Sequence, residues 1–109
     1  MFKKIFAVII LSVSYMVSSA PGDVTAKIAR VAALNGAVYI KTNPRPSPKP
    51  ACATNASYDF AFSLSDETGK ATLSMALSAY AAKSTVTVKA QGSCTVHGAM
   101  DDLKYLILE

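Results

Sequence analysis

The sequence has 109 residues, of which 51% are hydrophobic and 17% charged, and its formal net charge is +4 at pH 7. This length is enough for one domain and too short for two. Beyond the amino terminus the charges are scattered and form no basic run, so the charge pattern predicts neither a nucleic-acid groove nor a lipid-binding patch.

Residues 1–19 have the organisation of a secretory signal peptide. Lys3 and Lys4 form a positively charged start, and residues 5–17 are apolar apart from serines and one tyrosine. A membrane anchor is the weaker interpretation, because this run is shorter than the roughly 20 residues that a spanning helix needs. We therefore expect a cleavable signal and a secreted or periplasmic protein, with no stable membrane insertion after cleavage.

The mature protein is expected to be a single domain, residues 20–109. Cleavage after Ser19 is slightly preferred over cleavage after Ala20. Loss of Lys3 and Lys4 leaves 9 basic against 7 acidic residues, so the net charge falls to +2. A balance of this size does not indicate a polyanion as the partner.

The mature chain contains two cysteines, Cys52 and Cys94. An even count in a small exported protein is most simply a disulfide, which would stabilise the fold by roughly 4 kcal/mol. A redox or metal role is less favoured, because there is no CxxC pair and the single histidine adds too few ligands. No metal and no cofactor are expected.

Two strands joined by a tight turn are expected first. Residues 25–34 fit either an amphipathic helix or a strand with a bulge, and the residues that follow favour the strand. Asn35 and Gly36 suit a type I′ hairpin turn, and residues 37–41 are strongly β-prone.

Residues 43–50 carry proline at every second position, which predicts an extended loop and excludes a central strand. Such a segment can serve as a ligand for an aromatic-lined groove. A stiff surface loop between two strands is the favoured interpretation.

The cleanest alternation of the chain, over residues 58–64, predicts a third strand. The side chains expected in the core are Tyr58, Phe60, Phe62 and Leu64. Those expected to face outward, or toward a neighbouring subunit, are Asp59, Ala61 and Ser63.

The single helix is expected over residues 70–83, with Thr68 as its N-cap. The apolar spacing i, i+3, i+4, i+7 predicts that its buried face consists of Leu73, Ala76, Leu77 and Tyr80. A fourth strand should follow at once, because Val86 and Val88 alternate with polar residues.

The last predicted strand covers residues 103–108, directly after Asp101 and Asp102. Residues 94–96 could form a further strand or bulge before it. The last strand is apolar on both faces. In a small monomer one of these faces would be exposed to solvent, so the pattern favours association of subunits.

This order of elements predicts a mainly β fold with one α-helix: a small OB-fold-like five-stranded barrel (β-β-β-α-β-β) with one disulfide. The helix lies between the third and fourth strands, as in OB barrels.

Several segments together carry a family resemblance: the hairpin end at residues 36–40, Cys52, the aromatic strand, the helix and valine strand at residues 73–88, and Gly-Ser-Cys at residues 92–94. They resemble the small secreted bacterial proteins similar to the B subunit of subtilase cytotoxin, an AB5-type toxin. The resemblance implies an OB-fold domain with one internal disulfide. It also implies a homo-oligomeric ring of five, sialylated glycan ligands bound at shallow outer sites, and a toxin A subunit as partner.

Three residues are candidates for holding a glycan. Thr25 falls where the resemblance places a sugar-binding serine at the start of the first strand. Tyr39 and Tyr58 could supply the aromatic surface on which the apolar side of a sugar ring packs. Each of the three is more commonly a packed strand residue.

Other chemistries are less favoured. His97 with Asp101 and Asp102 invites a catalytic or metal site, but no nucleophile motif accompanies them, so no enzyme is expected. Three cations, Lys27, Arg30 and Lys41, could line a nucleic-acid face, but export argues against nucleic acid.

The leading interpretation is a secreted, non-enzymatic binding domain that recognises cell-surface glycans as an oligomer. The alternative is an envelope structural or interaction protein with no glycan ligand. A small hydrolase centred on His97 is the third hypothesis.

Overall fold

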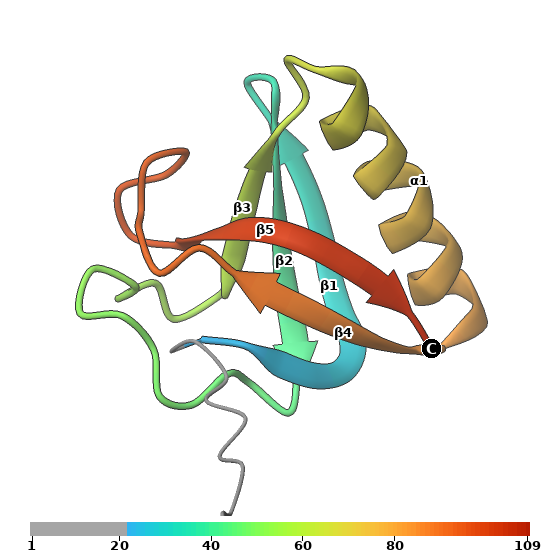
Figure 1. Cartoon of the computed structure of the whole chain (residues 1–109), viewed down its shortest axis with the longest axis horizontal. Coiled ribbons are helices and arrows are strands. Elements are labelled where there is room, and N and C mark those ends of the chain that lie inside the picture. The colour runs from blue at the N-terminus through green and yellow to red at the C-terminus, as the bar shows by residue number, and fades with distance from the viewer. Residues whose placement is uncertain (1–21) are drawn as a thin grey trace, which may run out of the picture.

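The computed structural model describes residues 22–109, which form five strands and one helix (Figure 1). The predicted signal peptide lies outside the described residues. In chain order the elements are β1 (Val24–Leu34), β2 (Ala37–Asn43), β3 (Phe60–Ser63), α1 (Glu67–Ala82), β4 (Thr85–Ala90) and β5 (Asp101–Leu108).

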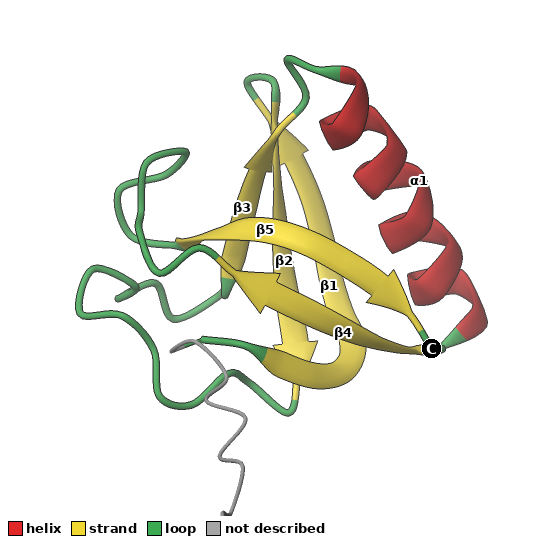
Figure 2. Ribbon diagram, viewed as in Figure 1, coloured by secondary structure: helices red, strands yellow, loops and turns green. Residues whose placement is uncertain are grey.

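The five strands form a barrel-like ring in the order β1-β2-β3-β5-β4, which closes because β4 also pairs with β1. Every pairing is antiparallel except the short parallel one between β3 and β5. Helix α1 lies along one side of the ring and contacts β1 and β5 (Figure 2). The predicted OB-like fold, mainly β with one helix between the third and fourth strands, is confirmed.

Strand β1 belongs to both halves of the ring. Its first residues pair with β4, and the rest pairs with β2. The register with β2 shifts between Ile28 and Arg30, so Ala29 is the extra residue of a bulge, and the strand bends strongly (Figure 1). Asn35 and Gly36 have positive φ angles of 53° and 75°, as a type I′ turn requires, so the predicted strand and hairpin are confirmed.

The core lies inside the ring and is built from the inward residues of the strands. Its fully buried side chains include Val38, Ile40, Phe60, Val86 and Val88. The predicted alternation in β4 is therefore confirmed, and in β3 Phe60 and Phe62 are buried as predicted.

The predicted extent of β3 was too long, and two of the three residues expected to face outward, Asp59 and Ala61, are buried. Tyr58 is half-buried and precedes the strand. Ala61, expected outside, is completely buried. Its strand lies between β2 and β5, so this small side chain has the larger residues Tyr39 and Asp102 as its neighbours on either side. Asp59, also expected outside, is only 1% exposed, because cations of the proline-rich loop fold over it.

Helix α1 begins earlier than predicted, and its buried stripe agrees with the prediction only in part: Ala76 is buried and Leu73 is half-buried against the core, as expected. Its N-cap is Asp66, whose carboxylate accepts a 2.7 Å hydrogen bond from the Gly69 amide, and Thr68 lies within the helix. The buried residues are Gly69, Thr72, Ala76 and Ala79.

Leu77 and Tyr80, predicted in the buried face of α1, are 49% and 47% exposed. The physical reason is close packing at the start of the helix. A Cβ at position 69 would lie 1.9 Å from the Ser63 carbonyl oxygen, so only glycine allows this approach. The small residues of the helix then meet the sheet, and the large side chains are left at its flanks.

Strand β5 starts earlier than predicted, because Asp101 and Asp102 are part of it. Residues 91–100 form a loop, apart from an isolated bridge between His97 and Met100, and residues 94–96 are not a strand. Three apolar side chains of β5 are exposed, namely Tyr105, Ile107 and Leu108.

The predicted disulfide between Cys52 and Cys94 is present, with the two Cα atoms 6.1 Å apart. It joins the loop of residues 44–59 to the loop of residues 91–100, which lie together at one end of the ring (Figure 1). Among residues 22–109 no helix has the length and apolar character needed to cross a membrane.

Candidate binding site

Four side chains from four parts of the chain meet on the outside of the ring. We call them the aromatic patch: Arg30 of β1, Tyr39 of β2, Tyr58 of the loop 44–59, and His97 of the loop 91–100. The Tyr39 ring centroid lies 5.9 Å from that of Tyr58 and 5.4 Å from that of His97 in an edge-on arrangement. The Arg30 guanidinium carbon lies 5.8 Å from the Tyr58 ring centroid, within cation–π range.

The strands orient two members of the aromatic patch. Val38 and Ile40 point inward and are fully buried, so Tyr39 between them faces outward. Arg30 stands opposite Lys41 in the β1–β2 ladder, on the same outer face. In OB folds the face of strands 2 and 3, with the loops after strands 1 and 4, binds oligonucleotides and oligosaccharides. Tyr39 of β2 and the loop that carries His97 lie in corresponding positions.

Tyr58 is held by a side-chain turn just before it. The Asn55 side-chain oxygen accepts hydrogen bonds from the backbone amides of Ser57 and Tyr58, at 2.8 and 2.9 Å. The backbone amide of Asn55 in turn donates a hydrogen bond to the Ala99 carbonyl at 3.0 Å, which ties this turn to the neighbouring loop. The position of the Tyr58 side chain is therefore fixed by hydrogen bonds of its backbone as well as by contacts of its aromatic ring.

The residue after Tyr58 anchors the whole proline-rich loop. The buried Asp59 carboxylate lies 2.8 Å from a guanidinium nitrogen of Arg45 and 3.0 Å from the Lys49 ammonium, and it accepts a 3.0 Å bond from the Thr42 amide. Arg45 also donates to the carbonyl oxygens of Ala56 and Asn55. These contacts pull residues 44–50 back against β2 and β3. Asp59 was predicted to face outward, and no sequence signal indicated this cluster.

A second buried carboxylate shapes the loop that carries His97. Asp102 accepts hydrogen bonds from the backbone amides of Thr95 and Val96, at 2.9 Å each, and from the hydroxyls of Ser93 and Thr95. Burial would raise the pKa of Asp102, but these hydrogen bonds outweigh it and lower the pKa below its ordinary value. The ionised carboxylate therefore acts as the centre around which the loop folds.

Asp101 lies on the other side of β5, and its environment has the opposite effect. Burial raises its pKa, and the negative charges of Asp102 and Asp23 add to this, against opposing hydrogen bonds from Gly92 and Ser93. One carboxylate oxygen accepts from the Gly92 amide at 2.9 Å, and the other is buried without a partner in the described part of the chain.

His97 does not form a set with the two aspartates. Its Nδ1 accepts a 3.1 Å hydrogen bond from the Ala99 amide, and its ring packs on Tyr39. With Nδ1 occupied, Nε2 is the ring nitrogen left to contact a ligand. Within residues 22–109 no group of three or more potential metal-ligating side chains occurs.

Of the three predicted ligand residues, the structure brings two together. Tyr39 and Tyr58 are neighbours in the aromatic patch. Thr25 lies at the start of β1, opposite Thr87 of β4, and its hydroxyl is 3.1 Å from that of Thr87.

Arg30 and His97 are the members of the patch that sequence reasoning assigned to other roles. The Asn35-Gly36 turn sets the register that puts Arg30 opposite Lys41, so the outward position of Arg30 was within reach of the sequence. No sequence signal places His97 beside Tyr39, because the intervening loop is irregular.

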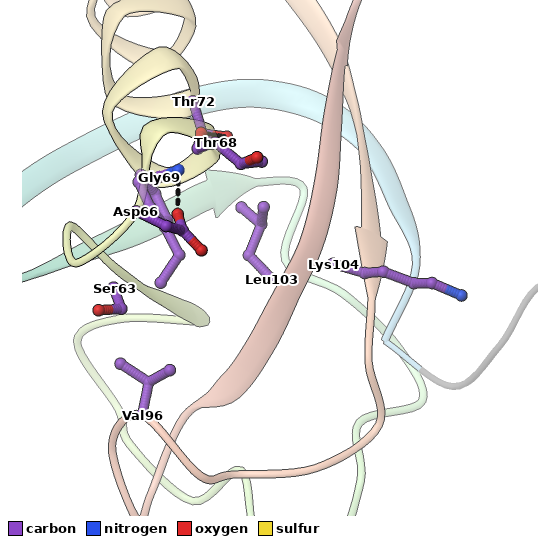
Figure 3. A pocket seen from close by; sticks show the side chains of 9 residues that line it. Ser63, Asp66, Thr68, Gly69, Thr72, Val96, Leu103 and Lys104 are labelled. Atoms are coloured by element: carbon purple, nitrogen blue, oxygen red, sulfur yellow. Dashed lines mark hydrogen bonds between the residues drawn. The ribbon is translucent and has the colours of Figure 1, made fainter.

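A hollow next to the start of α1 is a weaker site. It is lined by Phe62, Ser63, Asp66, Thr68, Gly69, Thr72, Val96, Leu103 and Lys104. Two of its polar side chains are already used, since Asp66 caps the helix and the Thr72 hydroxyl donates to the Thr68 carbonyl at 2.7 Å. Figure 3 also shows the Lys104 side chain extending away from it. The aromatic patch, whose rings and guanidinium face outward, is the better candidate.

Comparisons of the chain with protein-family models, with curated proteins and with solved structures gave no match. The assignment of a function therefore depends on the geometry of the patch and on the resemblance described above.

Proposed function

We propose that this protein is an exported, non-enzymatic binding domain that recognises a cell-surface glycan through the aromatic patch. The observation that carries the proposal is the meeting of Tyr39, Tyr58, His97 and Arg30 on the outer β1–β2 face. Half-buried rings held by their surroundings present a surface at low entropic cost, and a shallow site of this kind suits a sugar.

Each member of the aromatic patch has a role in this proposal. The tyrosine rings pack against the C–H face of a sugar, and their hydroxyls with Nε2 of His97 bond to its hydroxyl groups. The Arg30 guanidinium pairs with the carboxylate of an acidic sugar, which agrees with the sialylated ligands that the family resemblance implies. Thr25 remains a separate prediction for a second contact on another part of the barrel.

Export is part of the same proposal. A disulfide between Cys52 and Cys94 is compatible with a location outside the cytoplasm. Together with the predicted signal at residues 1–19, it supports secretion or release into the periplasm.

We also propose that the domain works as a homo-oligomer, a ring of five by the resemblance, beside a toxin A subunit. The exposed Tyr105 and Ile107 of β5, at 45% and 41%, offer apolar surface for a contact between copies. Native mass spectrometry and analytical ultracentrifugation of the mature protein test this directly, and a monomer at all concentrations would contradict it.

The test of the binding site begins with a glycan array and continues with titration of the best ligand. Tyr58→Ala and Arg30→Gln should each weaken binding about tenfold or more, which corresponds to the loss of one stacking or charged contact. Tyr80→Ala and Lys70→Gln are the matched controls, because both residues are exposed on α1 and lie outside the patch and outside the β5 surface proposed for contacts between copies. Wild-type affinity in the two patch variants would rule out the aromatic patch as the site.

The alternative function, an envelope interaction protein without a glycan ligand, makes the opposite prediction for the array. It predicts no binding to any glycan on the array, and association with a protein through the apolar surface of β5. The exposed Tyr105, Ile107 and Leu108 are the observation in its favour.

A further inference from the structure

A second hollow lies on a different part of the molecule, between the end of α1 and the bulge of β1. We call it the basic groove. It is lined by Lys27, Ile28 and Ala29 of β1, Asn43 at the end of β2, and Tyr80, Ala81 and Lys83 at the end of α1. Its volume of about 500 Å³ is within the range of small-molecule sites.

The charge of the basic groove is unbalanced. Lys27 and Lys83 come from different elements, and no carboxylate lines the groove. The ion pairs found within residues 22–109 use other cations, namely Arg45, Lys49, Lys70 and Lys89. Two ammonium groups that share a concave site without a counter-ion attract an anion.

The rest of the lining is apolar or amide. Ile28, Ala29 and Ala81 supply hydrocarbon, and Tyr80 adds an aromatic ring that is 47% exposed. The bulge at Ala29 turns β1 at this point, and bulges are common beside binding sites. The lining therefore suits a ligand that has an apolar body as well as a charge.

The backbone at Lys83 gives a second, independent observation. Lys83 is the C-cap of α1 and has φ 53° and ψ 37°, the left-handed conformation that glycine adopts most easily. Its amide caps the helix by donating to the carbonyls of Ala79 and Tyr80, which glycine would do equally well. A non-glycine residue in this conformation carries backbone strain, and strained residues cluster at ligand sites and switch regions.

We propose that the basic groove binds a small amphiphilic organic anion. Its carboxylate, sulfonate or phosphate group pairs with the ammonium groups of Lys27 and Lys83, and its apolar body packs on Tyr80 and the hydrocarbon of the bulge. Asn43, opposite Lys27 in the β1–β2 ladder, supplies an amide beside the charged end.

The test uses 8-anilinonaphthalene-1-sulfonate as the probe on the folded, oxidised protein. Its fluorescence gives the affinity, and ¹⁵N–¹H spectra locate it. Binding should shift the amide signals of Ile28, Ala29 and Ala81, and the double variant Lys27→Gln, Lys83→Gln should weaken it about tenfold. Equal affinity for the uncharged analogue N-phenyl-1-naphthylamine, or an unchanged double variant, would overturn the proposal.

Two further variants distinguish anion binding in the basic groove from a structural role of Lys83 and from binding at the aromatic patch. Lys83→Gly should weaken probe binding without lowering the melting temperature, because glycine fits the left-handed cap. A loss of binding together with unfolding would instead show a structural role and contradict the proposal. Arg30→Gln should leave probe affinity unchanged, since Arg30 belongs to the aromatic patch. A loss of anion binding in the basic groove can therefore be distinguished from a loss of glycan binding at the aromatic patch.

Discussion

At the scale of single residues, two adjacent aspartates of β5 show how side-chain direction decides the state of a carboxyl group. Asp102 faces the loop 91–100 and is surrounded by amide and hydroxyl donors, which lower its pKa. Asp101 faces the other side, where one oxygen has no partner within the described chain and burial raises its pKa. From the sequence, the two aspartates could only be considered together, beside His97, as a candidate catalytic or metal set.

The opposite shifts predict opposite pH effects on stability. The folded pKa of Asp101 is raised, so its contribution is fully present below the unfolded value of 3.8 and is lost as pH rises through the folded pKa. The stability of the wild type relative to Asp101→Asn should therefore increase as pH falls from 7 toward 4. Urea unfolding of both proteins across this range measures the difference, and a constant difference would contradict the assignment.

For Asp102 the sign is reversed, because its folded pKa is lowered. Its contribution is present above 3.8 and is lost as pH falls through the folded pKa. Asp102→Asn should cost about 2 kcal/mol of unfolding free energy at pH 7, where it weakens charge-assisted hydrogen bonds to the loop. The same urea series should show this cost shrinking at acidic pH below 3.8.

Asp59 carries a third prediction at this scale. Asp59→Asn should lower the unfolding free energy by about 2–3 kcal/mol, because the Arg45 and Lys49 cations lose their buried partner while remaining partly solvated. Glu67→Gln is the matched control, since its 3.6 Å pair with Lys70 is exposed, and should have little effect. Equal effects of the two substitutions in urea unfolding would show that burial of the pair does not matter.

At the scale of elements, helix α1 shows why apolar periodicity alone can select the wrong face. The spacing of the large residues predicted Leu77 and Tyr80 inside, but the helix is placed by its smallest residues. Gly69 must meet the Ser63 carbonyl, and this contact rotates the small stripe toward the sheet. The existence of the helix depended on local propensity, whereas its orientation depended on a contact that no local pattern reveals.

Two alanine substitutions in this one helix should therefore act in opposite directions. Gly69→Ala should lower the unfolding free energy by about 2 kcal/mol, despite better helix propensity, because its Cβ has no room against the Ser63 backbone. Ser74→Ala, on the exposed face, should raise stability by a few tenths of a kcal/mol. Thermal unfolding by circular dichroism measures both, and a stabilised Gly69→Ala protein would refute the close contact.

At the scale of the whole molecule, the order of the strands and the disulfide were predictable, and the loops were not. The hairpin turn, the alternation in β3 and β4 and the position of the helix each carry a local signal. The aromatic patch needed the tertiary structure, because it joins two loops whose shapes depend on Asp59 and Asp102. Two of its four members, Tyr39 and Tyr58, could be named from the sequence as ligand residues.

The disulfide connects stability to the proposed binding activity at this scale. The double variant Cys52→Ser, Cys94→Ser should lose roughly 4 kcal/mol of unfolding free energy. It should also bind glycan more weakly, because the loops that hold Tyr58 and His97 lose their covalent link and, within residues 22–109, keep only the hydrogen bond from Asn55 to Ala99. Titration well below the melting temperature separates the two effects, and unchanged affinity would show that the loops are ordered without the bridge.

Strand β5 is the last of the six elements along the chain, yet it pairs with both β3 and β4. Because a polypeptide is synthesised amino end first, Phe60 and the valines of β4 stay without these partners until the eight residues of β5 have been made. The ring therefore cannot close on a nascent chain, and its folding has to follow the synthesis of β5.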